Sequence, residues 1–566
     1  MNLLRGLARN LPRPVRTSLH RLWLRLNTDT TGVERLRAYA EPQRPGLLTF
    51  CTTVWNTAPP FLDALAESLF AQQGGTEFEW LILDNGSQDA GTRRALARIA
   101  QHPCVRLHRV ENNLGIIRGM RFCLERASGR YILPLDSDDV LSRDCARIFT
   151  TIIVENGFPA LLYSDEDKLL DGRRVLTYLK PDWDPVLFLH SCYIAHLCAI
   201  DRSLALEYGV YTDPRVEGSH DWDSFTRFHL NGHVPVHVPE VVYSWRMHAG
   251  STAQNIDSKS FIVDSQRAVL ERFLSGHQPA GRYRIEKSPL FNDTPDWRIR
   301  RAPGDEPGLT TFLLTDDPSR PVPGIPSAGY PGHRVVPVAL AGGVAALLEA
   351  LGEAGGLAHL LWDGVALRDP DWAWEALALM ELFPDTVMVG GRILDAQQRV
   401  TSAAALFGFG KGCDAPDRMR PINDPGYFAM LWKPHSTSAV SSQHAVFRAG
   451  FLRTLLDQPE AGSRMSLAYL GAWAGAAARR LGGRVVYSPF LHGQAEQDWN
   501  ELVTARERAA FVLANADLMP ERRYASAHFG SDPTAPQRAA PAAQRAAQHE
   551  ALLQWARSSA HAGVAS

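Results

Sequence analysis

The order of hydrophobic and polar positions predicts alternating strands and helices in the first part of the chain. The apolar, β-prone runs that predict strands are 47–54, 80–83, 105–109 and 131–135. The stretches between them that have helical spacing are 60–73, 92–101 and 115–127. This alternation is typical of βαβ units with a parallel sheet, in which ligands bind beyond the carboxyl ends of the strands.

A similar alternation restarts beyond about residue 300, beginning with the apolar run 310–314. A chain of 566 residues is long enough for two substantial domains at about 100–200 residues each. We therefore expect two α/β domains with extra segments at the ends of the chain. The expected parts are a basic arm and linker at 1–45, a first domain at 46–290, a second at 300–500, and a low-complexity tail at 501–566 with one helix near 542–557.

The first 28 residues carry six arginines and no acidic residue, with leucine and tryptophan between them. Residues 15–26 could form a short basic amphipathic helix that attaches to an anionic membrane surface. A solvated arm is an equal alternative. The chain has no apolar run of about 18 residues, and this segment lacks the features of a signal peptide.

Composition narrows the class of protein. The net charge of −2 gives no overall attraction to nucleic acid. Seven cysteines without a CxxC pair are typical of free thiols in a reducing compartment. We expect a cytoplasmic protein, peripheral at the inner face of the cell membrane if the basic arm binds lipid.

Acidic residues gather where the predicted strands and helices begin or end. Asp136, Ser137, Asp138 and Asp139 follow a strand, and two carboxylates at i and i+2 can share a hard divalent cation. Such a cation stabilises the negative charge that builds on a diphosphate leaving group. A D-x-D sequence alone is more often a solvated turn or a helix cap.

Three further segments strengthen the interpretation of this loop as a site. Residues 165–168 (DEDK) follow the apolar strand 160–163, residues 217–223 (EGSHDWD) begin a helix, and residues 243–251 (YSWRMHAGS) form a loop with a cation and an imidazole. Taken singly, Asp221 could be a helix N-terminal carboxylate, and His248 an exposed loop histidine.

The order of these motifs resembles the family-two glycosyltransferases with the GT-A fold, in particular bacterial enzymes that build O-antigen and capsule chains. The resemblance covers about residues 46–256. Thr53 replaces a usual proline, and Asn85 replaces the second acid of a turn. The motifs that carry it are TVWN at 53–56, DNGS at 84–87, NLG at 113–115, Gly129 to Asp139, YSDEDK at 163–168, KPDW at 180–183, EGSHDWD at 217–223 and WRMHAGST at 245–252.

The resemblance implies an inverting, metal-dependent glycosyltransferase. It would move a sugar from a nucleotide-diphospho-sugar to a hydroxyl of a lipid-linked or growing cell-surface polysaccharide. The implied roles are Asp221 as catalytic base; Thr53, Trp55 and Asp84 around the base and ribose; Asp136 at the ribose or the metal; Asp138 and His248 at a Mg²⁺ or Mn²⁺ ion; and Arg246 or Ser251 near the diphosphate. Trp183 and Trp222 either stack on sugars or pack in the core.

Residues 300–500 resemble the same family a second time, without its carboxylates. Aligning Asp136 with Asp363 places Val365 opposite Asp138, and aligning the helices places Ala472 opposite Asp221. Valine and alanine can neither hold a cation nor accept a proton. We therefore expect a degenerate GT-A-like domain, a pseudo-enzyme with a structural or acceptor-binding role.

Two alternatives remain for the whole chain. The first is a non-catalytic saccharide-binding scaffold of a polysaccharide assembly complex, against which the acids of the first domain argue. The second is a metal-dependent nucleotidyltransferase that forms sugar nucleotides. That class needs a glycine-rich loop with a basic residue near the first strand, and residues 54–60 have none.

Overall fold

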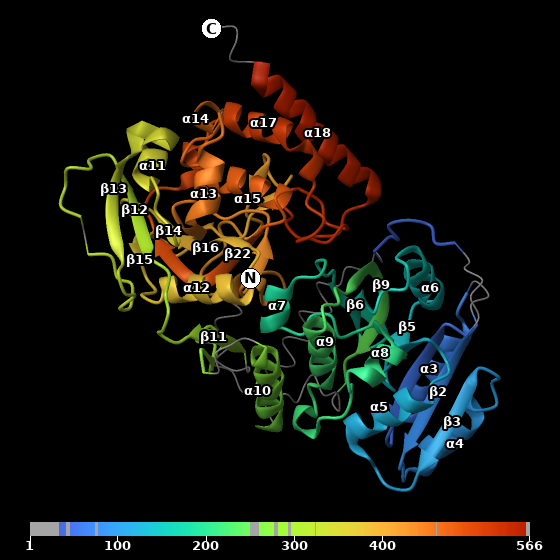
Figure 1. Cartoon of the computed structure of the whole chain (residues 1–566). Helices are drawn as coiled ribbons and strands as arrows, with labels where there is room; N and C mark the ends of the chain where they lie inside the picture. Colours follow the sequence, from blue (N-terminus) through green and yellow to red (C-terminus); the bar gives the residue numbers. More distant parts are fainter. Residues whose placement is uncertain are drawn as a thin grey trace. The chain divides into compact units, whose positions relative to one another are not determined.

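The computed structural model describes residues 33–40, 46–73, 77–248, 260–276, 281–291, 296–322, 324–459 and 461–561. The chain divides into two compact units (Figure 1). Unit 1 comprises residues 1–183, 192–276 and 291–295, and unit 2 comprises 184–191, 277–290 and 296–566. Each unit is built around a nine-stranded sheet, and the predicted α/β class is confirmed for both. The basic arm at residues 1–28 lies outside the described residues.

The sheet of unit 1 has the order β3-β2-β1-β4-β8-β6-β9-β5, with β7 paired to β6. Its strands are β1 (Leu48–Val54), β2 (Phe78–Asn85), β3 (Val105–Val110), β4 (Tyr131–Pro134), β5 (Val140–Leu141), β6 (Leu161–Leu170), β7 (Arg173–Tyr178), β8 (Cys198–Asp201) and β9 (Val236–Arg246). Its helices are α3 (Pro59–Phe70), α4 (Ala90–Ile99), α5 (Gly115–Arg126), α6 (Cys145–Glu155), α8 (Arg202–Glu207), the 3-10 turn η1 (Pro214–Val216), α9 (His220–Leu230) and α10 (Ser260–Ser275).

Strands β1, β2 and β4 are parallel, so their carboxyl ends lie at one edge of the sheet. Val54 pairs with Asp84, and Cys51 pairs with Pro134. In β1 every residue except Thr53 is buried, and in β2 residues 80–85 are buried, so both faces of these strands are covered, as is typical of a parallel sheet. Helix α5 packs against both strands.

Residues 165–168 lie inside strand β6, so the expectation that they follow a strand is wrong. The strand continues to Leu170 because it pairs with β8, β9 and β7. Its acids tolerate this position because cationic and backbone groups face them, as described below. A run of four charged residues does not resemble an apolar strand. A prediction from the local sequence pattern therefore places the end of this strand too early.

Unit 2 contains these strands: β10 (Tyr283–Lys287), β11 (Trp297–Arg301), β12 (Leu309–Thr315), β13 (Arg334–Ala339), β14 (Leu357–Trp362), β15 (Ala366–Leu367), β16 (Thr386–Leu394), β17 (Val400–Ser402), β18 (Leu406–Phe407), β19 (Cys413–Asp414), β20 (His435–Thr437), β21 (His444–Arg448) and β22 (Arg484–Gln494). Its helices are α7 (Pro185–His190), α11 (Gly343–Leu351), α12 (Trp372–Leu382), α13 (Ala449–Leu456), α14 (Ala461–Arg464), α15 (Leu470–Arg480), α16 (Trp499–Leu502), α17 (Ala505–Ala514) and α18 (Ala542–His561), with 3-10 turns η4 (Leu340–Gly342), η5 (Tyr427–Trp432) and η6 (Ala516–Leu518).

The main sheet of unit 2 repeats the sheet of unit 1. Its order, β13-β12-β14-β21-β16-β22-β15, matches β2-β1-β4-β8-β6-β9-β5 strand for strand, and β17 pairs with β16 as β7 pairs with β6. Parallel and antiparallel pairings also agree at each of these steps, from β12–β13 to β15–β22. No strand of the main unit 2 sheet corresponds to β3 within the described residues.

The strand registers correct the residue correspondence expected from sequence. Tyr131 of unit 1 and Leu357 of unit 2 occupy equivalent positions in their sheets, and so do Val140 and Ala366. The number of residues from Tyr131 to Val140 equals the number from Leu357 to Ala366. Trp362 therefore lies opposite Asp136, and Gly364 lies opposite Asp138. The alignment of Asp363 with Asp136 is off by one position.

The helix correspondence shifts in the same direction. Helices α9 and α15 both have 11 residues, and Gly232 and Gly482 follow them at positive φ of 81° and 73°. Gly471 therefore lies opposite Asp221, and the alignment of Ala472 with Asp221 is also wrong by one. The similar segments DWD and AWA favoured that alignment, whereas the helix bounds and the glycine after each helix decide the spatial one.

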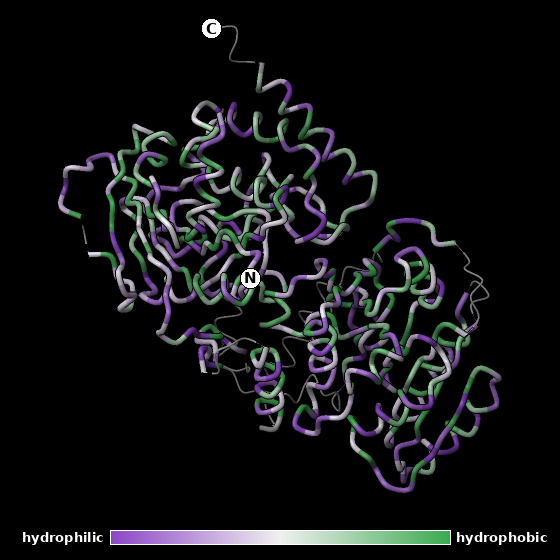
Figure 2. The backbone as a smooth tube through the Cα atoms, in the orientation of Figure 1, coloured by the Kyte–Doolittle hydropathy of each residue, from purple (hydrophilic) through white to green (hydrophobic). Residues whose placement is uncertain are grey.

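Helix α18 has 20 residues, and hydrophobic and hydrophilic positions are mixed along it (Figure 2). In the described part of the chain, no helix is long and apolar enough to cross a membrane.

Candidate active site

Three loops meet at the carboxyl edge of the unit 1 sheet. The Thr57 and Ser137 hydroxyl oxygens are 2.7 Å apart, which joins the loop after β1 to the loop after β4. Asn56, at a positive φ of 53°, accepts hydrogen bonds from the backbone of Gln88 (2.8 Å) and Asp89 (2.9 Å). Asparagine is among the few residues that adopt this conformation readily. The polar residues that end neighbouring strands thus form one connected edge.

The turn after β2 fixes Asp84 in a buried position. Asp84 is 3% exposed, its Oδ1 accepts a hydrogen bond from the Ser87 backbone (2.9 Å), and Arg109 lies 3.5 Å from Oδ2. Trp55, in the loop after β1, is 58% exposed. Thr53 faces Gly119 of α5, where an added Cβ would lie 3.1 Å from the Thr53 methyl group. Of these three residues, Trp55 presents the large open aromatic surface.

The end of β9 lies across the acidic loop 136–139. Strand β5 pairs with β9 directly after this loop, with Val140 opposite Ser244. His248 Nε2 consequently lies 2.7 Å from Asp138 Oδ2, and Arg246 Nε donates to the Asp138 carbonyl oxygen at 2.6 Å. The pairing of two short strands therefore joins the D-x-D segment to the W-R-x-H segment.

Asp139 joins the acidic loop to the end of β9. It is fully buried and accepts hydrogen bonds from the Tyr243 hydroxyl and from the Arg246 backbone (2.7 Å). Burial raises the pKa of Asp139, and the charges of Asp136 and Asp138 add to this rise. Asp139 is thus committed to positioning β9, whereas Asp136 and Asp138 remain reachable from solvent.

Electrostatic interactions connect Asp136, Asp138 and Asp221. Although Asp136 is exposed at the loop surface, the surrounding protein displaces enough water to raise its pKa. His196 opposes this rise, and the charges of Asp138 and Asp221 add to it. Like charges at close range disfavour ionisation of each other, and a bound cation removes that cost. The fold therefore brings Asp221, from a distant part of the sequence, close to Asp136 and Asp138.

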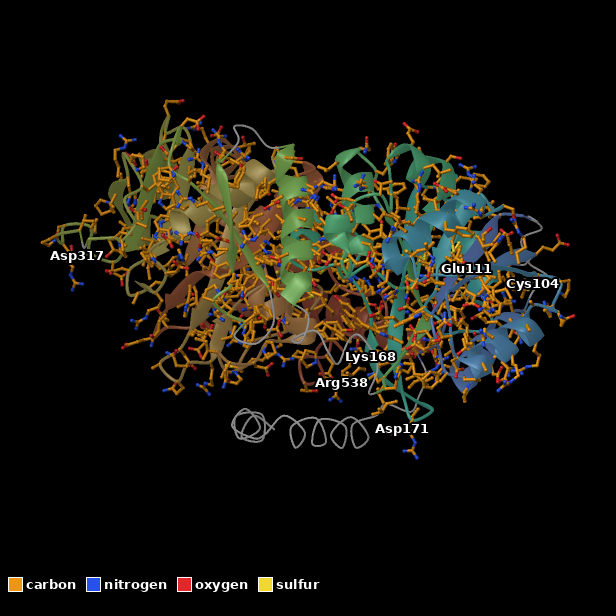
Figure 3. All side chains as sticks on the ribbon, turned by 90° about the horizontal axis from the view of Figure 1, so that it is seen from below. Cys104, Glu111, Lys168, Asp171, Asp317 and Arg538 are labelled. Carbon is orange, nitrogen blue, oxygen red and sulfur yellow. The ribbon has the colours of Figure 1, made fainter. Side chains whose placement is uncertain are left out.

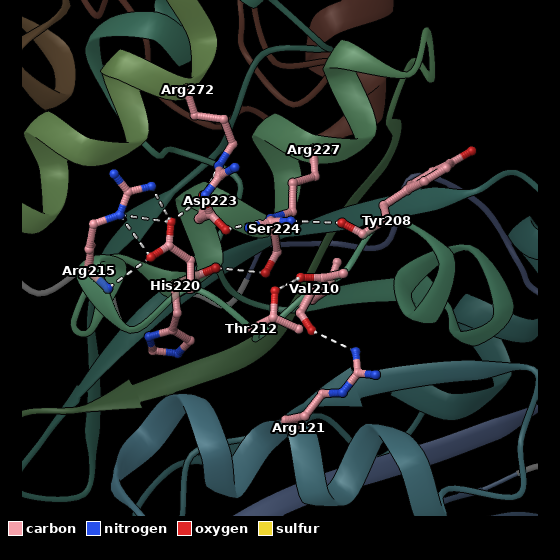
Figure 4. Close-up of polar contacts among 12 residues, drawn as sticks. Arg121, Tyr208, Val210, Thr212, Arg215, His220, Asp223, Ser224, Arg227 and Arg272 are labelled. Carbon is pink, nitrogen blue, oxygen red and sulfur yellow. Dashed lines mark hydrogen bonds and ion pairs between the residues drawn. The ribbon is translucent and has the colours of Figure 1, made fainter. Parts of the chain in front are cut away.

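Asp221 and Asp223 have different environments although they lie on one helix. Asp221 is the second residue of α9; its side chain is 23% exposed and lies 3.5 Å from His220 Nε2. Asp223 is 2% exposed and is held by Arg227 (2.7 Å) and Arg272 (2.5 Å) (Figure 4). Only Asp221 is placed to meet a ligand.

The remaining acid of this segment, Glu217, closes a helix terminus. Its carboxylate accepts hydrogen bonds from the backbone of Ile116 (2.7 Å) and Ile117 (3.3 Å) at the start of α5. A carboxylate at this position satisfies free N–H groups and interacts favourably with the helix dipole. The NLG and EGS motifs are therefore in direct contact.

A buried layer behind the acidic loop contains the YSDEDK and KPDW motifs. The Lys180 side chain is fully buried, with Nζ 3.2 Å from Glu166 Oε2 and 2.5 Å from the His196 carbonyl oxygen. The His196 ring stacks on Tyr243 at 5.2 Å between centroids. His237 bridges Asp165 (2.8 Å) and Asp182 (3.0 Å). Asp165 and Glu166 are largely buried and support the site, whereas the Asp182 side chain is 49% exposed.

Several placements were not evident from the sequence. Phe61 of α3 lies against both His248 (4.9 Å between centroids) and Arg246 (5.0 Å), and no motif includes it. His196 likewise belongs to no motif. Trp183 and Trp222 are 9% and 5% exposed, which favours core packing for both. Ser251 lies outside the described residues.

Among the described residues, no group of three His, Cys, Asp or Glu side chains is arranged as a metal site. The donor set of Asp138, His248 and Asp136 nevertheless fits a cation that also binds substrate. Mg²⁺ is usually held by one or two carboxylates together with substrate phosphate oxygens. A site of this kind is not complete in protein atoms alone.

Comparison with known proteins confirms the resemblance. Residues 49–175 match the family described as Glycosyl transferase family 2, so the chain contains a domain of this family. A protein of Sinorhizobium fredii named "Uncharacterized protein y4gI" is 27% identical over 445 residues, which cover 72% of this chain and 48% of that protein. The O-antigen biosynthesis protein RfbC of Myxococcus xanthus is 24% identical over 272 residues, covering 47% of this chain and 20% of that protein. The chain therefore spans half or less of these relatives.

Two solved structures are similar to part of the chain. Staphylococcus aureus TarS 1–349 in complex with UDP-GlcNAc is 17% identical with a TM-score of 0.35, covering 41% of this chain and 68% of that one. The mannosyltransferase PcManGT from Pyrobaculum calidifontis in complex with GDP-Man and Mn²⁺ is 17% identical with a TM-score of 0.32, covering 44% and 71%.

Proposed function

We propose that unit 1 is an inverting glycosyltransferase that uses a nucleotide-diphospho-sugar. The observation that carries this proposal is the 2.7 Å contact of His248 with Asp138, beside Asp136 and Asp221, within a glycosyl transferase family 2 domain. Carboxylates, an imidazole and a guanidinium at one edge of an α/β sheet suit the handling of a diphosphate.

Asp221 acts as the general base in this proposal. Its carboxylate takes the proton from an acceptor hydroxyl as that oxygen attacks the anomeric carbon, opposite the departing diphosphate. One displacement inverts the anomeric centre, so an α-linked donor gives a β-linked product. The partial exposure of Asp221 leaves an acceptor access to the carboxylate.

Asp138, His248 and Asp136 would hold Mg²⁺ or Mn²⁺. When bound, the ion offsets the negative charge that develops on the diphosphate. Arg246, and Ser251 further along the same segment, would lie near that diphosphate. Thr53, Trp55 and Asp84 would line the base and ribose, with exposed Trp55 stacking on the base.

The proposed acceptor is a lipid-linked or growing cell-surface polysaccharide. The printed name of the Myxococcus relative, an O-antigen biosynthesis protein, supports this class of acceptor. Such an acceptor would bring the enzyme to the cytoplasmic face of the membrane, where an anionic surface could bind the basic residues 1–28.

Unit 2 is proposed to be a pseudo-enzyme. Trp362, Gly364 and Gly471 stand at the positions of Asp136, Asp138 and Asp221. A Cβ atom at Gly471 would lie 1.9 Å from the Val440 carbonyl oxygen, so backbone fills the space that a base would need. Unit 2 therefore lacks both the chemistry and the room for this reaction.

The decisive experiment incubates purified full-length protein with UDP-, GDP- and dTDP-sugars and Mn²⁺ and measures nucleotide release. We expect release from one donor class, its loss in excess chelator, and loss of transfer in Asp221→Asn. If no donor is turned over and the protein still binds saccharides, the scaffold alternative holds instead.

A further inference from the structure

An aromatic ring contacts both side chains that lie across the acidic loop 136–139. The centroid of the Phe61 ring is 4.9 Å from the centroid of the His248 imidazole, with 39° between the two planes. The Arg246 guanidinium carbon lies 5.0 Å from the same Phe61 centroid. Arg246 and His248 in turn contact Asp138, at its carbonyl oxygen (2.6 Å) and at its carboxylate (2.7 Å). Phe61 is therefore one side chain away from the D-x-D segment.

Helix α3 holds Phe61 in a fixed position relative to this loop. Phe61 is the third residue of the helix. Thr57, two residues before the helix, has its hydroxyl oxygen 2.7 Å from that of Ser137 within the loop. Ser68, near the other end of the helix, accepts a hydrogen bond from the Leu141 backbone at 3.2 Å, directly beyond the loop. Because both ends of α3 are bonded to this segment, the Phe61 ring has a rigid support.

The packing of Phe61 differs from that of the core residues on its helix. Leu62 and Leu65 are buried in a hydrophobic cluster with strands of the unit 1 sheet. Phe61 is half-buried, and among the described residues it does not belong to that cluster. A leucine at position 61 could cover much of the same surface, but it could not offer an aromatic face to a cation or an imidazole. The contacts with Arg246 and His248 thus depend on the ring.

Arg246 retains N–H groups for a ligand while it packs on this ring. Its Nε atom donates to the Asp138 carbonyl oxygen, and its backbone N–H donates to Asp139. Within the part of the chain that the structure describes, no hydrogen bond or ion pair engages its Nη groups. A planar guanidinium suits phosphate oxygens, and an aromatic face stabilises it without using an N–H donor. The Phe61 ring therefore supports Arg246 and leaves its donors open to an oxyanion.

We propose that Phe61 is a positioning residue for the diphosphate of the donor. It holds Arg246 and His248 against the acidic loop, and through them it determines how tightly unit 1 binds a nucleoside diphosphate. This inference rests on the proposed function of unit 1. Phe61 acts through its two neighbours and does not contact the reacting atoms. Its loss should therefore weaken binding more than it slows the chemical step.

Calorimetric titration of the full-length protein tests this role without requiring turnover. The probes are UDP, GDP and dTDP, each with Mn²⁺. We expect Phe61→Leu to weaken the bound diphosphate about 5- to 30-fold, which corresponds to a cation–π contact of about 1–2 kcal/mol at about 1.4 kcal/mol per factor of ten. Phe61→Tyr keeps the aromatic face and should stay within about 2-fold of wild type. If Phe61→Leu does not fold, Phe61→Met serves in its place.

Phe70→Leu is the matched control. Phe70 is also an aromatic residue of α3, is 39% exposed, and stacks on His102 at 4.0 Å between centroids. It makes the same kind of ring contact at the opposite end of the helix, so Phe70→Leu should leave the nucleotide affinity unchanged. Thermal unfolding of each variant without nucleotide verifies that it is folded.

A double-mutant cycle shows whether Phe61 acts through Arg246. Arg246→Met keeps an unbranched side chain and removes the guanidinium. If the ring acts by positioning that group, Phe61→Leu should cost much less in the Arg246→Met background than in wild type. Steady-state turnover gives a further measurement: the donor KM should rise by the same factor as the dissociation constant, whereas kcat should change by less than about 3-fold.

Failure of this inference differs from failure of the proposed function. If wild type binds none of the three diphosphates with Mn²⁺ and releases nucleotide from no donor, the proposed function is wrong and the role of Phe61 falls with it. If wild type binds one of them, three results each overturn the role of Phe61 alone. These are unchanged affinity in Phe61→Leu, equal weakening by Phe61→Leu and Phe61→Tyr, and losses for Phe61→Leu and Arg246→Met that simply multiply in the double variant.

Discussion

His248 Nε2 lies 2.7 Å from Asp138 Oδ2, although 110 positions separate the two residues in the chain. The two-residue strand β5 creates this contact by pairing with β9 directly beyond the acidic loop. Tyr243 and Arg246 then tie β9 to Asp139, so that the loop and the strand end hold each other in place.

Asp138→Asn should abolish cation-dependent donor binding and leave the fold intact. The amide keeps the size of the side chain but loses the charge that attracts a divalent ion. We expect at least a 10-fold loss in nucleotide affinity with Mn²⁺, and no transfer by wild type in excess chelator. Asp171→Asn is the matched control, because Asp171 is exposed at the turn between β6 and β7 (Figure 3). Wild-type turnover in excess chelator would exclude a metal-dependent mechanism.

Asp221→Asn and Asp223→Asn should separate catalysis from stability. The first should retain donor binding while transfer falls at least about 100-fold, since an amide cannot accept the proton. The second should unfold more easily by about 2 kcal/mol, because Asp223 binds two arginines from a buried position. Turnover and denaturant unfolding are measured for both variants. If Asp223→Asn abolishes transfer while Asp221→Asn only lowers stability, Asp223 is the base.

The His237 imidazole should make stability depend on pH. Burial alone would lower its pKa, but the carboxylates of Asp165 and Asp182 raise the pKa to about 9. The unfolded pKa is about 6.5, so this stabilisation is fully present below that pH and is lost as pH rises through 9.

His237→Gln should therefore flatten the fall in unfolding free energy between pH 6.5 and 9. The difference from wild type should reach at most about 3.5 kcal/mol, because the pKa rises from about 6.5 to about 9 and one pKa unit corresponds to about 1.4 kcal/mol. His233→Gln is the control, since His233 is also in unit 1 and contacts the Tyr208 hydroxyl rather than a carboxylate. Parallel pH profiles for wild type and His237→Gln would contradict the assignment.

Gly471→Ala should destabilise unit 2 by about 1–3 kcal/mol, because the new methyl group would overlap the Val440 carbonyl oxygen. Gly450→Ala should instead stabilise helix α13 by about 0.5–1 kcal/mol, since its Cβ would meet no atom within 4 Å. Thermal unfolding of the two variants measures the contrast. A mild effect of Gly471→Ala would show that the base position of unit 2 has room for a side chain.

The sequence by itself determined the alternation of strands and helices in unit 1 and the presence of a second, similar unit. Hydrophobic runs of strand length, and hydrophobic residues at helical spacing, are patterns of neighbouring residues and can therefore be recognised in the sequence alone. The motif order was enough to indicate glycosyl transferase family 2, which the match at residues 49–175 confirms. The sequence also showed that the second copy lacks the acids.

Only the tertiary structure decided which polar groups face one another. Asp165 and Asp167 look like site residues in the sequence, but lie buried in β6. Their charge is offset by His237, from a distant segment, and by Arg174 of the adjacent strand β7. The alignments of Asp363 with Asp136 and of Ala472 with Asp221 were each wrong by one position. Similar short sequences can be aligned in more than one way, whereas the strand pairings and helix bounds of the structure allow one correspondence. Arg392 carries no sequence signal either. Among the described residues its Nε and Nη1 atoms have no hydrogen-bond partner, and its burial results from the pairing of β16 with β22, a strand that lies about ninety residues further along the chain.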